Sequence, residues 1–156
     1  MNRGDLQDAL KLLNVQAFLN AVRLGEGTSD ELGYYRIVGG GTFTDDSVHP
    51  HVKVFLPKYN VYSTAAGAYQ IIFPTWTGLC KQYDFPDFTP QSQDEAAVAL
   101  IAEKHALEDV KAGRLEDAVA KCAAIWASLP GSTAGQRTED FAKVQEMYIS
   151  HGGTIA

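Results

Sequence analysis

The chain has 156 residues, 46% of them hydrophobic, which is the size and apolar content of one domain with a single core. Its 13 Lys and Arg residues against 19 Asp and Glu residues give a net charge of −6, and no basic run occurs. This charge argues against nucleic acid or an anionic membrane surface as a partner.

We expect a single domain over residues 1–156, with residues 1–13 as an N-terminal extension. The extension lacks the apolar stretch of a signal peptide, and no segment approaches the roughly 20 apolar residues of a membrane span. The sequence therefore predicts synthesis in the cytoplasm without membrane insertion.

The first predicted helix begins at Asn14, a plausible N-cap residue. Its apolar residues recur at helical spacing and are Val15, Phe18, Leu19 and Val22. Gly25 or Gly27 should end the helix, because glycine readily adopts the left-handed conformation found at helix ends. Glu26 is thereby placed at the C-terminal edge of the helix.

Glu26 is a lone carboxylate between two glycines. On these residues alone, a solvated glutamate at a helix end is the simpler interpretation. The apolar helix before it would, however, remove water from the carboxyl and raise its pKa from ~4.3 toward ~6. The helix dipole would add a small rise. A carboxyl with such a pKa can donate a proton at neutral pH.

Residues 28–64 have no helical period. Short β-prone pieces at residues 34–38 and 51–56 predict a small irregular sheet with long loops. Asp45 and Asp46 in this region could supply a second carboxylate for glycoside hydrolysis or form an Asx turn. The His49-Pro50-His51 spacing matches no common zinc pattern, so we expect no metal and no cofactor.

Helical periodicity returns after residue 64. We predict helices over residues 65–72, from Pro74, after Thr89-Pro90 as far as His105, over residues 115–126, and over residues 141–151. The predicted class is α+β, with a body of about five helices, a β-rich flap after the first helix, and a cleft between them.

Within residues 65–72, Tyr69 offers stacking area and Gln70 offers amide hydrogen bonds to a sugar. The small residues around them would let a ligand approach the backbone, but a helix packed on a neighbour explains them equally well. The cysteines, Cys80 and Cys122, could form one disulfide, but two free thiols are the expectation.

A series of short motifs runs in order from about Phe18 to Thr154 and resembles the bacteriophage lambda type of endolysin, a lysozyme-like lytic transglycosylase. The motifs are Glu26-Gly27-Thr28, Tyr34 with Ile37-Val38-Gly39-Gly40, Phe43-Thr44-Asp45, His49-Pro50, Ser63-Thr64, Ala66-Gly67, Tyr69-Gln70, Phe88-Thr89-Pro90, Ser92-Gln93-Asp94, Ile125–Gly131 and Gly135-Gln136.

The resemblance implies a lysozyme-like fold in which Glu26 is the catalytic acid. The implied substrate-binding residues are Gln70, Tyr69, Tyr34, Asp45 and Gln136. It also implies two lips over the glycan strand, at about residues 50–60 and 132–138. The expected enzyme is a monomer that is made in the host cytoplasm, reaches the periplasm through a separate holin-type pore, and cuts peptidoglycan.

Two positions depart from the family. Members can carry Asp at the place of Tyr35 and Arg at the place of Ala68, and the first departure removes a possible second carboxylate. A lytic transglycosylase, which closes the muramoyl 6-hydroxyl onto the anomeric carbon, tolerates that loss. The alternatives are a hydrolytic muramidase in which Asp45 or Asp46 positions water, and a glycan-binding phage module without catalysis.

Overall fold

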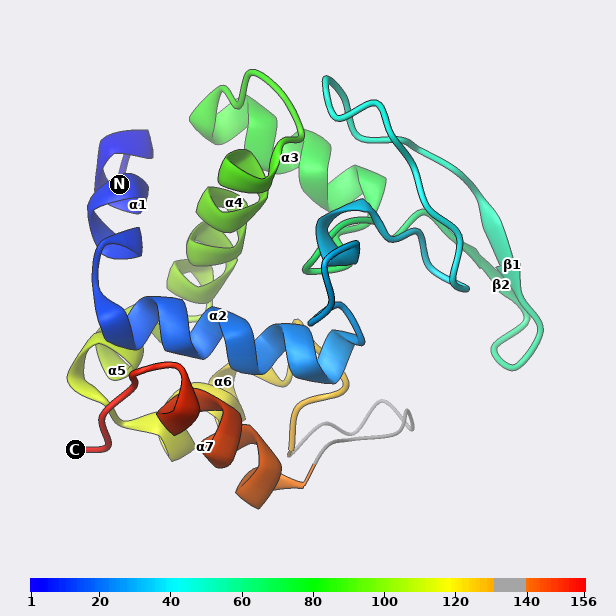
Figure 1. Ribbon diagram of the computed structural model, residues 1–156. Helices are drawn as coiled ribbons and strands as arrows, with labels where there is room; N and C mark the ends of the chain where they lie inside the picture. The colour runs from blue at the N-terminus through cyan, green and yellow to red at the C-terminus, as the bar shows by residue number, and fades with distance from the viewer. Residues whose placement is uncertain (131–139) are drawn as a thin grey trace.

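The computed structural model describes residues 1–130 and 140–156 (Figure 1). This part of the chain contains a 3₁₀ helix, a two-stranded sheet and seven α-helices, which confirms the α+β class. The elements are α1 (Arg3–Leu10), α2 (Leu13–Glu26), η1 (Gly33–Tyr35), β1 (Val54–Leu56), β2 (Val61–Ser63), α3 (Phe73–Tyr83), α4 (Pro90–Glu103), α5 (Leu107–Ala112), α6 (Leu115–Cys122) and α7 (Phe141–Ser150).

The central element is α2, which crosses the helical body with α7 packed along it (Figure 1). The predicted apolar face is confirmed, since Val15, Phe18 and Val22 are fully buried. The predicted N-cap is wrong, because Leu12 takes that position. The Asn14 side chain instead donates to Lys111 O at 3.1 Å and accepts from Thr154 N at 3.0 Å, so it ties α2 to α5 and the C-terminus.

Residues 3–10, expected to belong to an extension, form the helix α1. A capping box between Asn2 and Asp5 starts it, and buried Leu6 and Ala9 pack it against α4. Arg3 adds an ion pair of 3.0 Å with Glu95, a fully buried residue of α4. Leu6, Ala9 and Leu10 fall at helical spacing in the sequence, so a local pattern was present that could have predicted this helix.

The helix expected over residues 65–72 does not form. Gly67 (φ +82°) and Gln70 (φ +49°) adopt left-handed conformations, and Ala66 pairs with Ile71 in an isolated β-bridge. The segment is a tight turn fixed by contacts distant in sequence: Ala68 N donates to Gln93 Oε1 at 2.9 Å. Tertiary hydrogen bonds have overridden the helical preference of the alanines.

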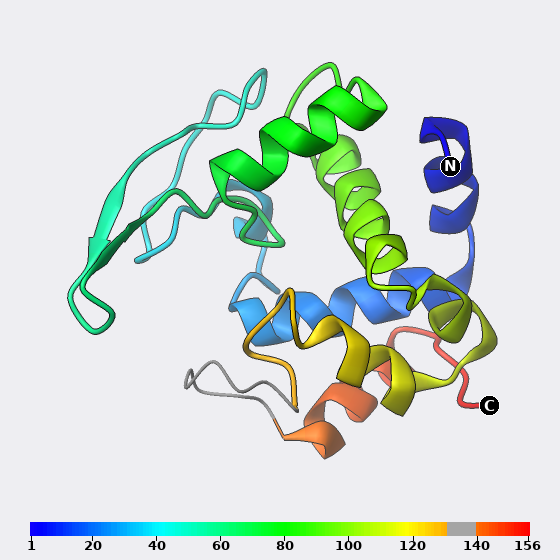
Figure 2. The ribbon, with the colours of Figure 1, turned by 180° about the vertical axis from the view of Figure 1, so that it is seen from behind.

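The flap contains less strand than expected. Residues 34–38 begin in η1 and make only the single bridges Arg36 to Thr42 and Ile37 to Ala66. Of residues 51–56, only β1 is a strand, and it pairs antiparallel with β2, with Phe55 opposite Tyr62. This hairpin projects from the helical body in both views (Figures 1 and 2).

The later helices are shorter than expected. α4 ends at Glu103, so His105 (φ +57°) lies beyond it, and α6 ends at Cys122, so Trp126 lies in the following turn. The short helix α5 was not foreseen from the sequence, and Gly113 ends it in the left-handed conformation. Cys80 is half-buried, Cys122 is buried, and both are free thiols.

We expect Gly67→Ala to lower the free energy of unfolding by about 2 kcal/mol or more, because a side chain is strained in the left-handed conformation. Its Cβ would also lie 2.4 Å from Gln93 Oε1. Gly78→Ala is the matched control: it lies inside α3 with open space around it and should stabilise by about 0.5–1 kcal/mol. Urea unfolding measures the free energy of unfolding of both variants. Equal changes in the two would contradict the strain expected for a side chain at position 67.

Candidate active site

Glu26 is the last residue of α2, as expected. Gly27 (φ +73°) ends the helix, and its N–H bonds back to the carbonyls of Arg23 and Leu24. The next residue, Thr28, is buried, and its hydroxyl donates to Ala68 O at 2.5 Å. These bonds anchor the backbone that follows Glu26 to the turn at residues 66–71.

Arg23 strengthens this anchor. Its guanidinium donates from Nε and Nη2 to Thr28 O, at 3.1 and 2.8 Å, and lies over the Tyr34 ring at 4.6 Å from the ring centroid. Both contacts tie the last turn of α2 to the segment after it. Arg23 therefore positions the residues on either side of Glu26.

The carboxyl of Glu26 is half-buried, and no described residue donates a hydrogen bond to it. Burial raises the pKa of Glu26 from 4.5 to about 7, which confirms the direction expected from its apolar surroundings. At neutral pH a large fraction of the Glu26 carboxyls is thus protonated. Such a group can donate a proton to a leaving oxygen and accept one afterwards.

Gln70 lines a cavity of about 350 Å³ whose other walls include Thr75, Glu103, Ile125 and Trp126. Its side-chain nitrogen donates to Gly67 O at 2.8 Å, which fixes the amide, and the amide oxygen is left available to a ligand. Trp126 is tied to the same turn, since its indole N–H donates to Tyr69 O at 3.0 Å. Gln70 is therefore placed as a preoriented hydrogen-bonding group.

Tyr69 and Tyr34 meet at a residue that the sequence reasoning did not single out. Their hydroxyls donate to the same oxygen, Asp94 Oδ1, at 2.6 and 2.8 Å. The Tyr69 side chain is 1% exposed, so it has no free face on which a sugar could stack. Asp94 carries no periodic signal that marks it as functional, although it belongs to the Ser92-Gln93-Asp94 motif.

The aspartates of the flap are engaged locally. Asp45 is exposed and accepts from Ser47 N and Oγ at 3.0 and 2.6 Å, which is the Asx turn considered above. Asp46 Oδ2 accepts from the Tyr35 hydroxyl at 2.8 Å. Gln136 and the second expected lip, residues 132–138, lie outside the described residues.

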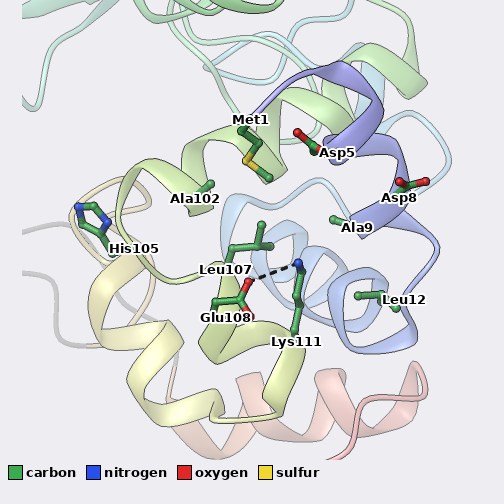
Figure 3. A pocket seen from close by; sticks show the side chains of 10 residues that line it. All are labelled: Met1, Asp5, Asp8, Ala9, Leu12, Ala102, His105, Leu107, Glu108 and Lys111. Atoms are coloured by element: carbon green, nitrogen blue, oxygen red, sulfur yellow. Dashed lines mark hydrogen bonds and ion pairs between the residues drawn. The ribbon is translucent and has the colours of Figure 1, made fainter.

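Another cavity, of about 700 Å³, lies at the opposite end of α2 between α1 and α5 (Figure 3). Lys111 and Glu108 form an ion pair of 3.4 Å on its rim, and Asp5 is used in the capping box of α1. Leu12 lines this cavity, and about 14 residues of helix, roughly 20 Å, separate it from Glu26. It therefore does not contribute to the site around Glu26.

Within residues 1–130 and 140–156, no cluster of three or more His, Cys, Asp or Glu side chains is arranged to hold a metal ion. No helix in the same ranges has both the length and the apolar character that crossing a bilayer demands.

A half-buried glutamic acid that ends a core helix, a turn that carries a fixed glutamine, and a projecting β-hairpin are together typical of lysozyme-like enzymes. Comparison with known proteins supports this assignment. The sequence profile of the Endolysin family matches residues 16–155. The endolysin of Escherichia phage P2 is 40% identical over 92% of this chain and 95% of its own length. The endolysin of Escherichia phage lambda is 39% identical over 90% of this chain and 92% of its own length.

Solved structures show the same relationship. Bacteriophage lambda lysozyme complexed with a chitohexasaccharide matches with a TM-score of 0.86 and 36% identity, over 92% of this chain and 97% of that one. A second structure of lysozyme from bacteriophage lambda matches with a TM-score of 0.83 and 35% identity over the same shares. The chain belongs to the endolysin family and has the lysozyme-like fold.

The raised pKa of Glu26 predicts a pH-dependent stability. The folded state binds more protons than the unfolded state between pH 4.5 and 7, so the free energy of unfolding should fall as pH rises through that window. Once ionised, the buried carboxylate costs about 3 kcal/mol. Glu26→Gln cannot ionise, so it should be more stable than the parent by up to this amount at about pH 8 and nearly equal at about pH 4.

Urea unfolding at several pH values measures this difference, with Glu146→Gln on the exposed surface of α7 as the matched control. The control should follow the pH dependence of the parent. The same pH dependence in Glu26→Gln as in the parent would show that Glu26 is not held in a desolvated site.

Proposed function

We propose that this endolysin is a lytic transglycosylase that cleaves the β-1,4 bond between N-acetylmuramic acid and N-acetylglucosamine in peptidoglycan, with Glu26 as the catalytic acid. The observation that carries the proposal is the burial of Glu26, which raises its pKa to about 7. The chitohexasaccharide bound to lambda lysozyme supports an extended glycan as the ligand.

In the proposed reaction, Glu26 gives its proton to the glycosidic oxygen as the bond from that oxygen to the anomeric carbon breaks. The 6-hydroxyl oxygen of the same muramoyl ring then bonds to the anomeric carbon, and its proton returns to the Glu26 carboxylate. The product has a 1,6-anhydromuramoyl end, no water is consumed, and the enzyme regains its starting protonation state.

The surroundings of Glu26 support this path over hydrolysis. Most hydrolytic glycosidases use a second carboxylate about 5–9.5 Å from the acid. Tyr35 stands where family members can carry Asp, and Asp46 binds its hydroxyl. Asp45 is bonded to Ser47, so both aspartates already have hydrogen-bond partners within the flap. A single group that acts as acid and then as base fits these residues.

General acid–base catalysis by one residue accelerates a reaction by about 10²–10⁴-fold. Further acceleration must come from groups that bind the distorted sugar ring and its developing charge. Gln70 is suited to this because its amide is fixed before substrate arrives. We assign the same role to the loop over residues 128–136, of which the described residues include Ser128, Leu129 and Pro130.

We further propose that the hairpin forms one lip of the cleft. Exposed side chains on it include Phe55, Tyr59 and Tyr62, which can lie against sugar rings. With Gln136 as a contact from the second lip, an extended strand would be held on both sides. We also propose a monomer that is made in the host cytoplasm and acts in the periplasm after release through a separate holin-type pore.

Product analysis tests the reaction. Digestion of purified peptidoglycan in water enriched in heavy oxygen should yield muropeptides one water lighter than hydrolytic products, with no heavy oxygen at the new end. Mass spectrometry reads both properties. Reducing ends that carry heavy oxygen would instead establish a hydrolytic muramidase.

Substitution of Glu26 tests the site. Glu26→Gln should lower the rate of clearing of a cell-wall suspension by about 10²-fold or more, because its amide cannot protonate the leaving oxygen. The activity of the parent should decline as pH rises above 7, where Glu26 ionises. Glu146→Gln should retain activity. Equal clearing by Glu26→Gln and the parent would assign the catalytic role to another residue, and a parent that does not clear the wall at all would point to a glycan-binding module.

A further inference from the structure

A separate polar cavity is lined by residues of α1, α2 and α4 together with Tyr34 and Tyr69. Its volume is about 300 Å³, at the lower end of the range for small-molecule sites. The side chains that define its chemistry are Gln16, Asn20, Arg23, Gln91 and Asp94. Tyr69 is a lining residue of both this cavity and the one beside Gln70.

The cavity presents an excess of hydrogen-bond acceptors. Gln16 donates to Leu10 O at 2.8 Å, Asn20 to Gln16 O at 3.0 Å, and Gln91 to Glu95 Oε2 at 2.9 Å. Each of these amide side chains thus has its nitrogen engaged by the protein, while no described residue donates to its oxygen. The amide oxygens of these three lining residues accept from no described residue and are available to a ligand that brings donors.

Asp94 adds a charged acceptor to the wall. Both tyrosine hydroxyls bind its Oδ1, and no described residue donates to its Oδ2. Burial raises the pKa of Asp94, and the two tyrosine hydrogen bonds and the Arg23 charge oppose that rise. A ligand ammonium, with three N–H donors, would both satisfy Oδ2 and stabilise the ionised carboxylate.

Arg23 supplies a positive charge in the same cavity. Its Nε and Nη2 are used by Thr28 O, but no described residue accepts from Nη1. Arg23 and Asp94 act on each other through space without forming an ion pair. The residues lining one small cavity thus offer a guanidinium whose Nη1 has no described acceptor, a carboxylate whose Oδ2 has no described donor, and acceptor amides.

We infer that this cavity binds a zwitterionic α-amino acid group, with its ammonium on Asp94 and the amide oxygens and its carboxylate on Arg23. Neutral sugars lack the two charges, and simple amines or carboxylates engage only one of them. The same chemistry occurs in free amino acids and at the diaminopimelate of peptidoglycan stem peptides. The stem-peptide source rests on the function proposed above, whereas the site itself does not.

Titration of isotope-labelled protein followed by NMR tests the inference, because the side-chain amides of Gln16, Asn20 and Gln91 report directly from the cavity. The probes are free meso-diaminopimelate, D-alanine, and a stem tetrapeptide that carries diaminopimelate. The half-ligands pentylamine and glutarate and the sugar N-acetylglucosamine are the controls. Zwitterions should shift the three amide signals saturably. Each control ligand should have a dissociation constant about tenfold higher or more.

Two variants locate the binding. Asp94→Asn removes the charge but keeps an oxygen for the tyrosines, and it should weaken zwitterion binding about tenfold or more. Asn20→Leu removes one acceptor that is not bonded to Tyr34, Tyr69 or Asp94, and it should also weaken zwitterion binding. Gln7→Leu, at an exposed position of α1, is the control and should leave binding unchanged. Thermal unfolding verifies that each variant is folded.

Binding of free diaminopimelate and of the tetrapeptide supports the stem-peptide source, and binding of the free amino acids alone supports the site with free amino acids as its ligands. Equal binding of a half-ligand or of N-acetylglucosamine, or no shift with any zwitterion, would overturn the inference. The NMR titration tests the cavity, and mass spectrometry of muropeptide products tests the proposed reaction. Failure of one proposal can therefore be distinguished from failure of the other.

Discussion

The side-chain amide of Gln93, buried at the start of α4, makes the hydrogen bonds on which the rest of the structure depends. Its nitrogen donates to Tyr34 O at 3.1 Å and to Phe88 O at 2.9 Å, and its oxygen accepts from Ala68 N at 2.9 Å. One side chain thereby joins α4, the flap and the tight turn. A buried amide is costly to leave unpaired, so each of these partners constrains the others.

The neighbouring residue, Asp94, extends the same constraint toward Gln70 and Glu26. Asp94 holds the hydroxyls of Tyr34 and Tyr69, and Trp126 holds the backbone of Tyr69 from the other side. Gln70 follows Tyr69 directly, and Thr28 anchors the chain after Glu26 to Ala68. The acid and the glutamine are therefore positioned by one connected network rather than by separate local contacts. Such preorganisation is what an active site requires of its surroundings.

The desolvation of Glu26 has a cost that the rest of the fold must offset. A carboxyl whose pKa rises to about 7 destabilises the folded state once it ionises. Fully buried side chains of α2, among them Phe18 and Val22, and the contacts with α7 supply the apolar burial that opposes this cost. The raised pKa of Glu26 and the reduced stability expected at alkaline pH thus arise from the same burial.

The sequence by itself determined the α+β class, the core face of α2 and the placement of Glu26 at the C-terminal edge of that helix, because these follow from local periodicity and glycine chemistry. It left the end of the helix open between Gly25 and Gly27, and the structure places it at Gly27. It also carried the motifs that resemble the endolysins. Only the tertiary structure decided that residues 65–72 form a turn, that Tyr69 is buried and that Asp94 joins two tyrosines. Those features depend on side chains of α4 more than 20 residues away in the chain, and a local pattern contains no information about such partners.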